Sequence, residues 1–289
     1  SLDRRQRQMC IRDRNNICSK MKKLSLKSPA KINLNLTILK KLKNGYHTIS
    51  TSFQLIDLFD EIEFESSENN ISVSSNLEEL NSDDNIITTV ARKLKNSNSK
   101  LGVKVKLKKL IPIGAGLGGG SSNAASTIVA LNKLWDLKMS KNEMHNFGRS
   151  IGADIPFFLF GQNAHGDGIG DILKYKDSIT EEILIINPMI FTSTQEMYHE
   201  YDLLNKKNKI IKDNPYNNDF LDIFLKKHDQ VKKFFENNAH EFKIRLSGSG
   251  SCMYVLYNDK KKIQKFIKKI PSNWRFFSCK PLQYSPICY

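Results

Sequence analysis

Apolar and polar residues alternate along several segments in the first half of the chain, which is the pattern of a strand with one buried face. Residues 32–38 and 101–108 show this alternation most clearly, and lysines occupy the polar side of the second segment. A short apolar stretch at 24–28 and a run at 53–64 predict further strands, the latter broken near residues 58–60. The N-terminal half is therefore expected to contain a sheet.

Apolar residues three or four positions apart follow these strands and predict helices. In the first half the expected helices cover 84–94, 123–135 and 141–151, and residues 152–156 are expected to form a loop. Ser82 or Asp83 is the expected N-cap of the first of these helices.

The second half of the chain alternates strands with helices, which predicts a second α+β domain. A Gly-rich connection at 161–170 is expected to separate the two halves. The segments expected in the second half are strands near 183–187 and 252–257 and helices near 194–204, 218–237 and 259–269.

A Gly-rich segment lies between the strand at 101–108 and the helix at 123–135. It reads Gly114-Ala115-Gly116-Leu117-Gly118-Gly119-Gly120-Ser121-Ser122, with five glycines in nine residues. Glycine is costly to order, so such a run suggests a backbone that must approach a ligand closely. The N-terminus of a helix binds anions through unpaired N–H groups and the helix dipole. The segment therefore predicts a phosphate-binding loop.

Two familiar phosphate loops fit this segment poorly. A Walker A loop requires a lysine before its Ser or Thr, and residues 114–122 contain none. Gly114, Gly116 and Gly119 fit the dinucleotide fingerprint G-x-G-x-x-G, but a Rossmann unit also needs an acidic residue at the end of a second strand. Asp136 has about the right spacing but follows a predicted helix, so the Rossmann interpretation is disfavoured.

Length and composition agree with a globular protein. The chain has 289 residues, a length that is enough for two ordinary domains. Of these residues 39% are hydrophobic and 26% are charged, which is close to the globular average. The densest apolar runs are far too short for a membrane-spanning helix. The five cysteines are scattered without CxxC or zinc-ligand spacing, which indicates a reduced, cytoplasmic chain.

The formal net charge of +15 raises the possibility of nucleic-acid binding. Only nine of the 45 basic residues are arginines, and five of these lie before residue 15. Proteins that read bases or bind single strands use arginines and stacked aromatics, and neither clusters in the rest of the chain. Lysine-rich segments at 206–212, 226–233 and 260–269 are interpreted as solvated surfaces that also attract anionic substrates. No nucleic-acid or membrane partner is expected.

Residues 1–21 do not share the pattern of the remaining chain. They are rich in arginine, show no apolar periodicity, and contain no hydrophobic core of a secretory signal. We interpret them as a non-native or disordered extension, with Met21 as the natural start. The expected domains are then an N-terminal one at 22–165, with the phosphate loop, and a C-terminal one at 166–289.

Five motifs in order along the chain give a resemblance to a known family, the GHMP small-molecule kinases. The motifs are Ser28-Pro29-Ala30-Lys31-Ile32-Asn33-Leu34, Asn44-Gly45-Tyr46-His47, Ile111-Pro112 through Ala125, Gly152-Ala153-Asp154-Ile155-Pro156, and Arg245-Leu246-Ser247-Gly248-Ser249-Gly250. The resemblance covers about residues 24–289. It implies a two-domain α+β fold, in which the N-terminal domain resembles domain 2 of ribosomal protein S5 and the C-terminal domain is ferredoxin-like.

Within this family the chain is most similar to kinases whose substrate carries a cytidine diphosphate and belongs to isoprenoid precursor synthesis. The resemblance implies transfer of the γ-phosphoryl group of ATP, with Mg²⁺, to a hydroxyl group of that substrate. It implies small-molecule substrates only, no tightly bound cofactor, and a monomer or homodimer.

The resemblance also implies roles for individual residues. Asp154 takes the position of the catalytic base, and Lys31 lies beside it as the second catalytic residue. Asn33 is expected to bind substrate or orient this pair, while Tyr46, His47 and Phe191 are expected to form the cytidine site. The expected ATP-binding residues are Asn85, Pro112, Gly114, Ala115, Gly116, Leu117, Gly118, Gly119, Gly120, Ser121 and Ser122. No metal ligand is assigned, although Ser121 or Ser122 is a candidate contact for Mg²⁺.

Two alternatives stay open on the sequence. Another GHMP kinase, of the homoserine or mevalonate type, would share most of these motifs. A non-catalytic nucleotide- or RNA-binding protein could use the same glycine loop and lysine-rich surface, although Lys31 and Asp154 argue against it.

Overall fold

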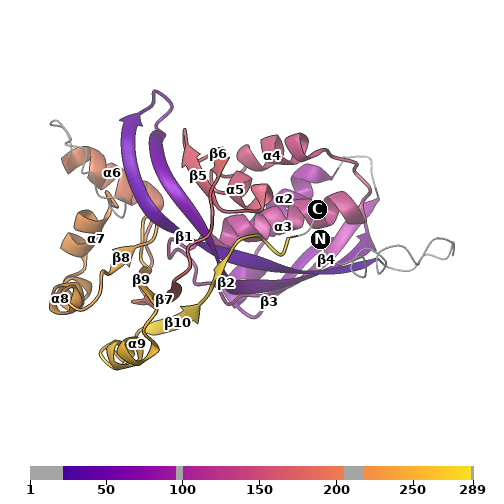
Figure 1. Cartoon of the computed structure of the whole chain (residues 1–289). Helices are drawn as coiled ribbons and strands as arrows, with labels where there is room; N and C mark the ends of the chain where they lie inside the picture. Colours follow the sequence, from indigo (N-terminus) through magenta and orange to yellow (C-terminus); the bar gives the residue numbers. More distant parts are fainter. Residues whose placement is uncertain (1–21, 96–99, 205–217, 288–289) are drawn as a thin grey trace.

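The computed structural model of the chain describes residues 22–95, 100–204 and 218–287. The predicted N-terminal extension at 1–21 and the lysine-rich segment at 206–212 lie outside the described residues. Figure 1 shows two α+β lobes side by side, joined along the long strands β1 and β2. The expected fold class is confirmed.

The first lobe is built on a seven-stranded sheet in which β2 is central. Strand β1 pairs with β2 along almost its whole length, as one long antiparallel hairpin. The other edge of β2 pairs in turn with β5, β11 and β4, and β3 and β6 extend the sheet at its two ends. The strands are β1 (Lys23–Lys41), β2 (His47–Glu68), β3 (Ile71–Ser75), β4 (Leu101–Lys108), β5 (Ala164–Asp167), β6 (Ile172–Tyr175) and β11 (Pro281–Leu282).

The predicted break in the second strand is wrong, because β2 runs without interruption through residues 58–60. Pro29 of β1 pairs with Phe59 and the next residue, Ala30, pairs with Ile56. Two residues of β2 are therefore accommodated in a bulge, which increases the local twist without ending the strand. The bulge lies beside the segment of β1 that carries Lys31.

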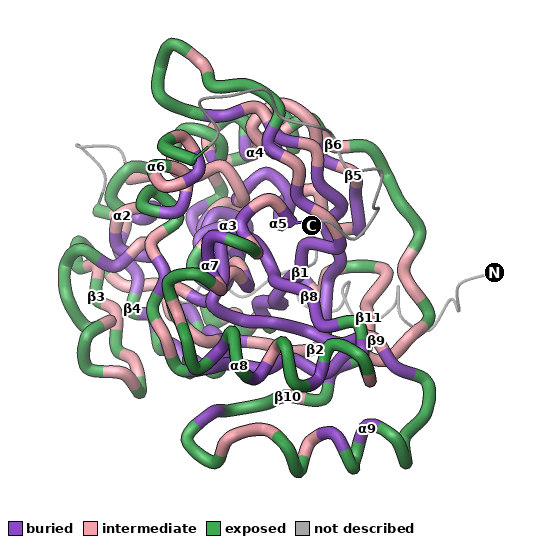
Figure 2. Tube along the Cα trace, turned by 90° about the vertical axis from the view of Figure 1, so that its left-hand side faces the viewer, coloured by how far each residue is buried: buried purple, intermediate pink, exposed green. Residues whose placement is uncertain are grey.

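Among the described residues the first lobe has four α-helices, and the central one begins earlier than predicted. The helices are α2 (Ile86–Leu94), α3 (Gly119–Leu134), α4 (Lys141–Arg149) and α5 (Ile155–Phe160), with a short 3₁₀ segment η1 (Glu78–Asn81) before α2. Helix α3 starts within the Gly-rich segment, four residues before Asn123. It contacts β1 and three helices and is therefore buried nearly all round, not on one face as its apolar spacing indicated (Figure 2).

Two further predictions about helix starts need correction. Helix α2 begins at Ile86, and its N-cap is Asn85, whose side chain accepts from the backbone N–H of Ile87; neither Ser82 nor Asp83 has this role. Residues 152–156 were expected to be loop, but helix α5 begins at Ile155. The Pro at its second position is compatible with a helix start because Pro needs no N–H partner there.

The second lobe has a four-stranded antiparallel sheet in the order β10-β7-β9-β8. With its intervening helices this is the ferredoxin-like arrangement that was expected. The predicted helix at 218–237 is two helices that meet at His228. The elements are β7 (Glu182–Asn187), α6 (Thr194–Leu204), α7 (Leu221–Lys227), α8 (Asp229–Asn238), β8 (Arg245–Leu246), β9 (Met253–Tyr257), α9 (Lys260–Ile267) and β10 (Arg275–Cys279).

The Gly-rich connection expected at 161–170 is part of the first sheet, because β5 and β6 form an antiparallel pair there. The boundary proposed between residues 165 and 166 thus falls inside β5, and the change from one sheet to the other comes between Tyr175 and Glu182. The chain also returns to the first lobe at its end, where β11 pairs with Leu55 and Ile56.

A continuous apolar core joins the two lobes. Ala30, Ile32 and Leu34 of β1 pack in one cluster with Ile185 of β7 and Tyr254 of β9. The Tyr254 hydroxyl donates to the carbonyl of Asn33 at 3.0 Å. Burial of this extent favours a fixed arrangement of the lobes, which is a condition for a site built between them.

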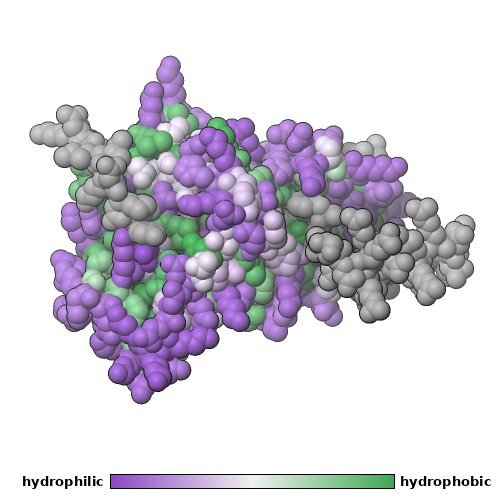
Figure 3. Space-filling model, viewed as in Figure 1, coloured by the Kyte–Doolittle hydropathy of each residue, from purple (hydrophilic) through white to green (hydrophobic). Residues whose placement is uncertain are grey.

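The surface of the second lobe agrees with the interpretation of its lysines. Helix α9 buries Ile263 and Phe266 on one side, whereas its lysines are exposed. The corresponding region at the lower left of Figure 3 is almost entirely hydrophilic. Among the described residues no helix combines the length and apolar character needed to cross a membrane.

The Gly-rich loop is fixed to both lobes through the carbonyl groups at its centre. The carbonyl of Gly116 accepts from the Ser247 hydroxyl at 2.9 Å and from Lys31 Nζ at 3.2 Å. The backbone N–H of Lys31 in turn donates to the carbonyl of Leu117 at 3.0 Å. Gly116 therefore connects the loop, strand β1 and the turn of the second lobe that begins at Ser247.

Two more carbonyl groups of the loop accept from the second lobe. Thr192 N–H donates to the carbonyl of Gly114 at 3.2 Å, and Cys252 N–H donates to that of Ala115 at 3.1 Å. Ala115 keeps a negative φ, as a residue with a methyl group requires, and its side chain is buried in the core between the lobes. The loop thus depends on both lobes for its shape.

A buried ion pair supports the loop from the first lobe. Asp60 is fully buried, and its carboxylate accepts a hydrogen bond from Lys109 Nζ. It also accepts from the backbone N–H groups of Leu110 and Ile111, both at 2.8 Å. Burial lowers the pKa of Lys109, an effect that the charge of Asp60 opposes. The ammonium group lies against the first residue of α3, because a Cβ at Gly119 would be 2.7 Å from it.

Asp60→Asn is expected to lower the free energy of unfolding by about 3–5 kcal/mol, because it leaves the buried ammonium of Lys109 without its counter-charge. Urea unfolding followed by circular dichroism measures this change. The control is Glu61→Gln at the next position, where the exposed pair with Lys108 is worth less than about 1 kcal/mol. Equal effects in the two variants would contradict the role of the buried pair.

Gly116→Ala is expected to lower the melting temperature strongly. The φ of Gly116 is +74°, and an added Cβ would lie 2.0 Å from the carbonyl oxygen of Ser247, so the turn of the second lobe would have to move. Gly120→Ala is the control, since a Cβ there meets no atom within 4 Å and alanine favours the helix. A melting temperature that is equal in the two variants would show that the loop tolerates displacement of the second lobe.

Candidate active site

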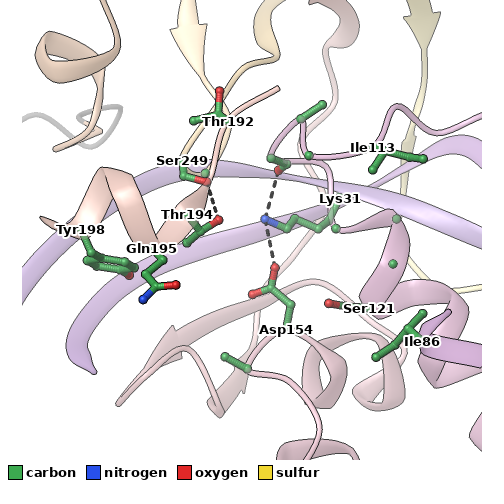
Figure 4. Close-up of a pocket in the computed structure, with 18 of the residues that line it drawn as sticks. Lys31, Ile86, Ile113, Ser121, Asp154, Thr192, Thr194, Gln195, Tyr198 and Ser249 are labelled. Atoms are coloured by element: carbon green, nitrogen blue, oxygen red, sulfur yellow. Dashed lines mark hydrogen bonds and ion pairs between the residues drawn. The ribbon is translucent and has the colours of Figure 1, made fainter. Parts of the chain in front are cut away.

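A cavity of about 1050 Å³ opens between the lobes. Its walls come from the Gly-rich loop, strand β1, the tip of the β1–β2 hairpin, the start of α2 and helix α6. Figure 4 shows Lys31 and Asp154 facing each other at its centre. Tyr198 and Gln195 lie on one side of this pair, and Ile86, Ile113 and Ser121 lie on the other. The cavity therefore has two ends that meet at a pair of opposite charges.

Lys31 is held rigidly although its side chain is long. Its Nζ donates to Asn33 Oδ1 at 2.6 Å and lies 3.4 Å from Asp154 Oδ2. The side chain is only 4% exposed, and its ammonium also lies 5.6 Å from the centre of the Phe53 ring. Strand alternation places Lys31 and Asn33 on the same face of β1.

Asn33 orients the lysine and is itself oriented. Its amide nitrogen donates to the Thr51 hydroxyl at 2.8 Å, and that hydroxyl donates to the carbonyl of Asn35 at 2.6 Å. This chain of donors fixes the Asn33 side chain with its oxygen toward Lys31. The expectation that Asn33 orients the catalytic pair remains a proposal, and this geometry supports it.

Asp154 occupies the N-cap position of α5, but its side chain makes no capping hydrogen bond. The carboxylate is instead directed at Lys31, with 35% of the side chain exposed to the cavity. A capping role, which would explain an aspartate at this position structurally, is therefore excluded. Asp154 remains accessible to a ligand while its position is fixed by a short helix.

Nine of the eleven residues expected to bind ATP line the cavity; Leu117 and Ser122 do not. Leu117 lies in the apolar core between the lobes. Ser122 is fully buried, and its hydroxyl has no partner among the described residues, whereas Ser121 reaches the cavity. Ser121 is therefore the better placed of the two candidate contacts for Mg²⁺.

Asn85 combines two features. It lines the cavity, and it caps α2 while its amide nitrogen donates to the carbonyl of Leu80 at 2.7 Å. Ile86, Ile113 and Leu80 provide apolar surface at the same end of the cavity. An adenine contact at Asn85 stays a proposal, to which this apolar surround adds support.

The opposite end of the cavity is aromatic. Tyr46 is 55% exposed at the tip of the hairpin, while His47 is buried and stacks on Tyr198 with 4.7 Å between ring centres and 10° between planes. Burial, followed by the charge of Asp154, raises the pKa of Tyr198, so this ring stays a neutral phenol. Tyr46, His47 and Tyr198 thus gather flat ring surfaces at one end.

Phe191 is not among the residues that line the cavity. Its ring is 72% exposed and packs over Gly114, where an added Cβ would lie 2.3 Å from it. The second lobe does supply Tyr198 to this end of the cavity, seven residues further on in α6. The sequence contained one signal for it, a tyrosine in the helix predicted at 194–204.

Several polar groups of the second lobe were also missed. Thr194 and Ser249 line the cavity and hydrogen-bond to each other at 2.8 Å, and Gln195 lies beside them. Asp202 lines the cavity from α6 and contacts His47. Ser249 belongs to the fifth motif but was given no role of its own. Thr194, Gln195 and Asp202 carry no local signal, since they become part of the site only through the packing of the lobes.

The described residues contain no group of three or more His, Cys, Asp or Glu side chains suited to hold a metal ion. A Mg²⁺ ion that arrives with a nucleotide is held mainly by phosphate oxygens and water and needs few protein ligands. Asp154 and Ser121 are two polar side chains that line the cavity near Lys31.

Comparison with known proteins shows the family to which the chain belongs. Residues 85–162, which include the Gly-rich loop and Asp154, match the GHMP kinases N terminal domain. The 4-diphosphocytidyl-2-C-methyl-D-erythritol kinase of Francisella philomiragia is 35% identical over 89% of this chain and 96% of its own length. The enzyme of the same name from Colwellia psychrerythraea is 34% identical over 92% of this chain and 93% of its own.

Solved structures show the same fold. A crystal structure of 4-(cytidine 5'-diphospho)-2C-methyl-D-erythritol kinase superposes with a TM-score of 0.75 and 24% identity, covering 89% of this chain and 99% of that one. A mevalonate kinase structure superposes less well, with a TM-score of 0.61 and 17% identity over 90% of this chain and 99% of that one. On these grounds the chain belongs to the GHMP kinases and, within them, to the family of 4-diphosphocytidyl-2-C-methyl-D-erythritol kinases.

Proposed function

We propose that the chain transfers the γ-phosphoryl group of ATP to the 2-hydroxyl of 4-diphosphocytidyl-2-C-methyl-D-erythritol, a step of isoprenoid precursor synthesis. The observation that carries this proposal is the position of the Lys31–Asp154 pair, between a phosphate-type loop and an aromatic pocket. Phosphoryl transfer depends mainly on positioning and on stabilisation of charge, and a cavity with two ends meets this requirement.

ATP fits the end formed by the Gly-rich loop. The first N–H groups of a helix have no partner within the helix, so the start of α3 offers donors and a positive dipole to phosphate oxygens. The close approach of Gly116, Gly118 and Gly119 to neighbouring atoms leaves no room for side chains there. The apolar surface of Ile86 and Ile113 suits an adenine ring beyond the phosphates.

The cytidine diphosphate part of the acceptor fits the aromatic end. Stacking of a base on an aromatic side chain is worth about 1–3 kcal/mol. Tyr46, His47 and Tyr198 supply ring surfaces, and Lys41 lines the same end with a positive charge. The hydroxyl that receives the phosphoryl group would then lie near Asp154.

Asp154 would accept the proton of this hydroxyl as the oxygen attacks the γ-phosphorus atom. Lys31 would stabilise negative charge on the transferred group and keep the carboxylate oriented, because its own position is fixed by Asn33 and Gly116. Magnesium bound to the phosphates would neutralise charge on the leaving group, with Ser121 as the nearest hydroxyl on the loop.

A homoserine or mevalonate kinase activity is the nearest alternative. Substrates of that size would leave the aromatic end of the cavity empty. A non-catalytic nucleotide-binding protein is disfavoured because it would not need the buried lysine that faces an uncapped aspartate. We therefore prefer the cytidine-containing acceptor.

Asp154→Asn is expected to lower kcat at least ~100-fold, the usual contribution of a positioned base. ADP release in the presence of Mg-ATP and the cytidine-containing substrate measures this loss. Asp136→Asn is the matched control, because Asp136 is exposed and remote from the cavity, and Asn also tolerates its positive φ of 51°.

Two results would contradict parts of the proposal. A near-normal rate in Asp154→Asn would reduce Asp154 to a structural carboxylate while leaving the kinase assignment intact. If the wild-type protein released no ADP with this substrate but did so with mevalonate or homoserine, the cytidine assignment would fail.

Tyr198→Leu is expected to raise KM for the cytidine-containing substrate about 5- to 100-fold with little change in KM for ATP, since it removes one stacking surface. The control is Phe234→Leu, a core substitution in the same lobe that lies outside the cavity. If both variants lose stability and only Tyr198→Leu raises this KM, base stacking is the cause. An unchanged KM in Tyr198→Leu would place the base elsewhere.

A further inference from the structure

At the aromatic end of the cavity, Asp202 of the second lobe contacts two residues of the β1–β2 hairpin. Oδ1 of Asp202, in α6, lies 2.7 Å from Nε2 of His47, the first residue of β2. The other carboxylate oxygen of Asp202 accepts from Lys41, the last residue of β1. The stacking of His47 on Tyr198, also in α6, belongs to the same contact. Asp202 and Tyr198 thus contact the imidazole from the second lobe.

Asp202 can only accept hydrogen bonds. Partial burial opposes ionisation of its carboxyl group, but hydrogen bonds from Lys41 and His47 outweigh this and lower its pKa. An ionised carboxylate carries no hydrogen to donate. The hydrogen in the contact with His47 must therefore be on Nε2 of the imidazole.

This assignment determines the character of the other ring nitrogen. In a neutral imidazole one nitrogen donates and the other accepts. When the imidazole is neutral and its hydrogen is on Nε2, Nδ1 of His47 is an acceptor. Within the described residues the ring makes no other hydrogen bond, and His47 lines the cavity, so Nδ1 is available to a ligand.

We propose that Asp202 is a positioning residue that fixes His47 in its Nε2–H form, so that the site prefers a pyrimidine with an amino group at position 4 over one with a carbonyl there. Cytosine presents an N–H donor at this position, whereas uracil presents an oxygen acceptor. An acceptor at Nδ1 bonds the first and repels the second. This inference rests on the proposed function, since it assumes that a nucleobase occupies the aromatic end.

Lys41 makes the arrangement more specific. It binds the second oxygen of Asp202, so the carboxylate is held at both ends and cannot rotate away from His47. The stacking on Tyr198 and the edge contact with Tyr201, 6.3 Å between ring centres, hold the plane of the imidazole. The tautomer and the orientation of His47 are therefore both determined by α6.

The test compares wild type, Asp202→Asn and Asp202→Glu in the full chain. An Asn side chain can turn its amide N–H toward Nε2 and so permits the other tautomer, whereas Glu remains an acceptor. The ¹⁵N shifts of labelled histidine report which ring nitrogen carries the hydrogen. Calorimetry with cytidine diphosphate and uridine diphosphate reports the preference between the bases.

We expect wild type to bind cytidine diphosphate at least ~10-fold more tightly than uridine diphosphate, about 1.4 kcal/mol. Asp202→Asn should reduce this ratio to below ~3-fold and shift the tautomer, and Asp202→Glu should retain most of the preference. The control is Asp167→Asn, which alters another Asp–His pair, with His165 at 3.2 Å, outside the cavity. It should leave the ratio unchanged.

The inference is overturned if Asp202→Asn weakens both nucleotides equally, because a general loss of structure would do so without changing the preference. It is also overturned if His47 keeps its Nε2–H form in that variant. Failure of the proposed function gives a different result: the wild-type protein would prefer cytidine diphosphate and show the Nε2–H form, yet would not phosphorylate the cytidine-containing acceptor.

Discussion

The carbonyl group of Gly116 is the contact on which the site depends most directly. It accepts from Lys31 of the first lobe and from Ser247 of the second, so a single backbone group sets the distance between the lysine, the loop and the neighbouring lobe. Only glycine permits this contact, because any side chain would meet the carbonyl of Ser247. The composition of the loop therefore reflects the junction of the lobes as well as the approach of phosphate.

The two lobes contribute different parts of the chemistry. The first supplies the charged pair and the start of α3, which suit a phosphate group and its transfer. The second supplies α6, whose Tyr198 and Asp202 complete the aromatic end around His47. Because both ends of the cavity meet at the Lys31–Asp154 pair, a phosphate donor and a hydroxyl acceptor are brought to one point. Neither lobe has to form both the donor site and the acceptor site by itself.

Much of the first lobe could be predicted from local pattern. Alternation identified the strands around Lys31 and at 101–108, and the glycine run identified the loop before α3. Local pattern failed where pairing or packing determined the outcome. The break expected in β2 is a bulge, since its partner β1 continues past it. Phe191 was expected at the base site and Tyr198 was not considered, because the direction in which α6 faces the cavity has no signature in sequence.

The sequence by itself determined the chemical groups: a buried strand with Lys31, a glycine loop at a helix start, and an aspartate before a Pro-containing helix. These are local properties, fixed by side-chain chemistry and by the periods of strand and helix. Only the tertiary structure decided that Asp154 faces Lys31 rather than capping its helix, and that Asp202 meets His47. Those contacts join residues more than 100 positions apart. The first depends on the packing of α5 against β2 within the first lobe, where Phe157 contacts Phe53, and the second depends on the apolar core between the lobes.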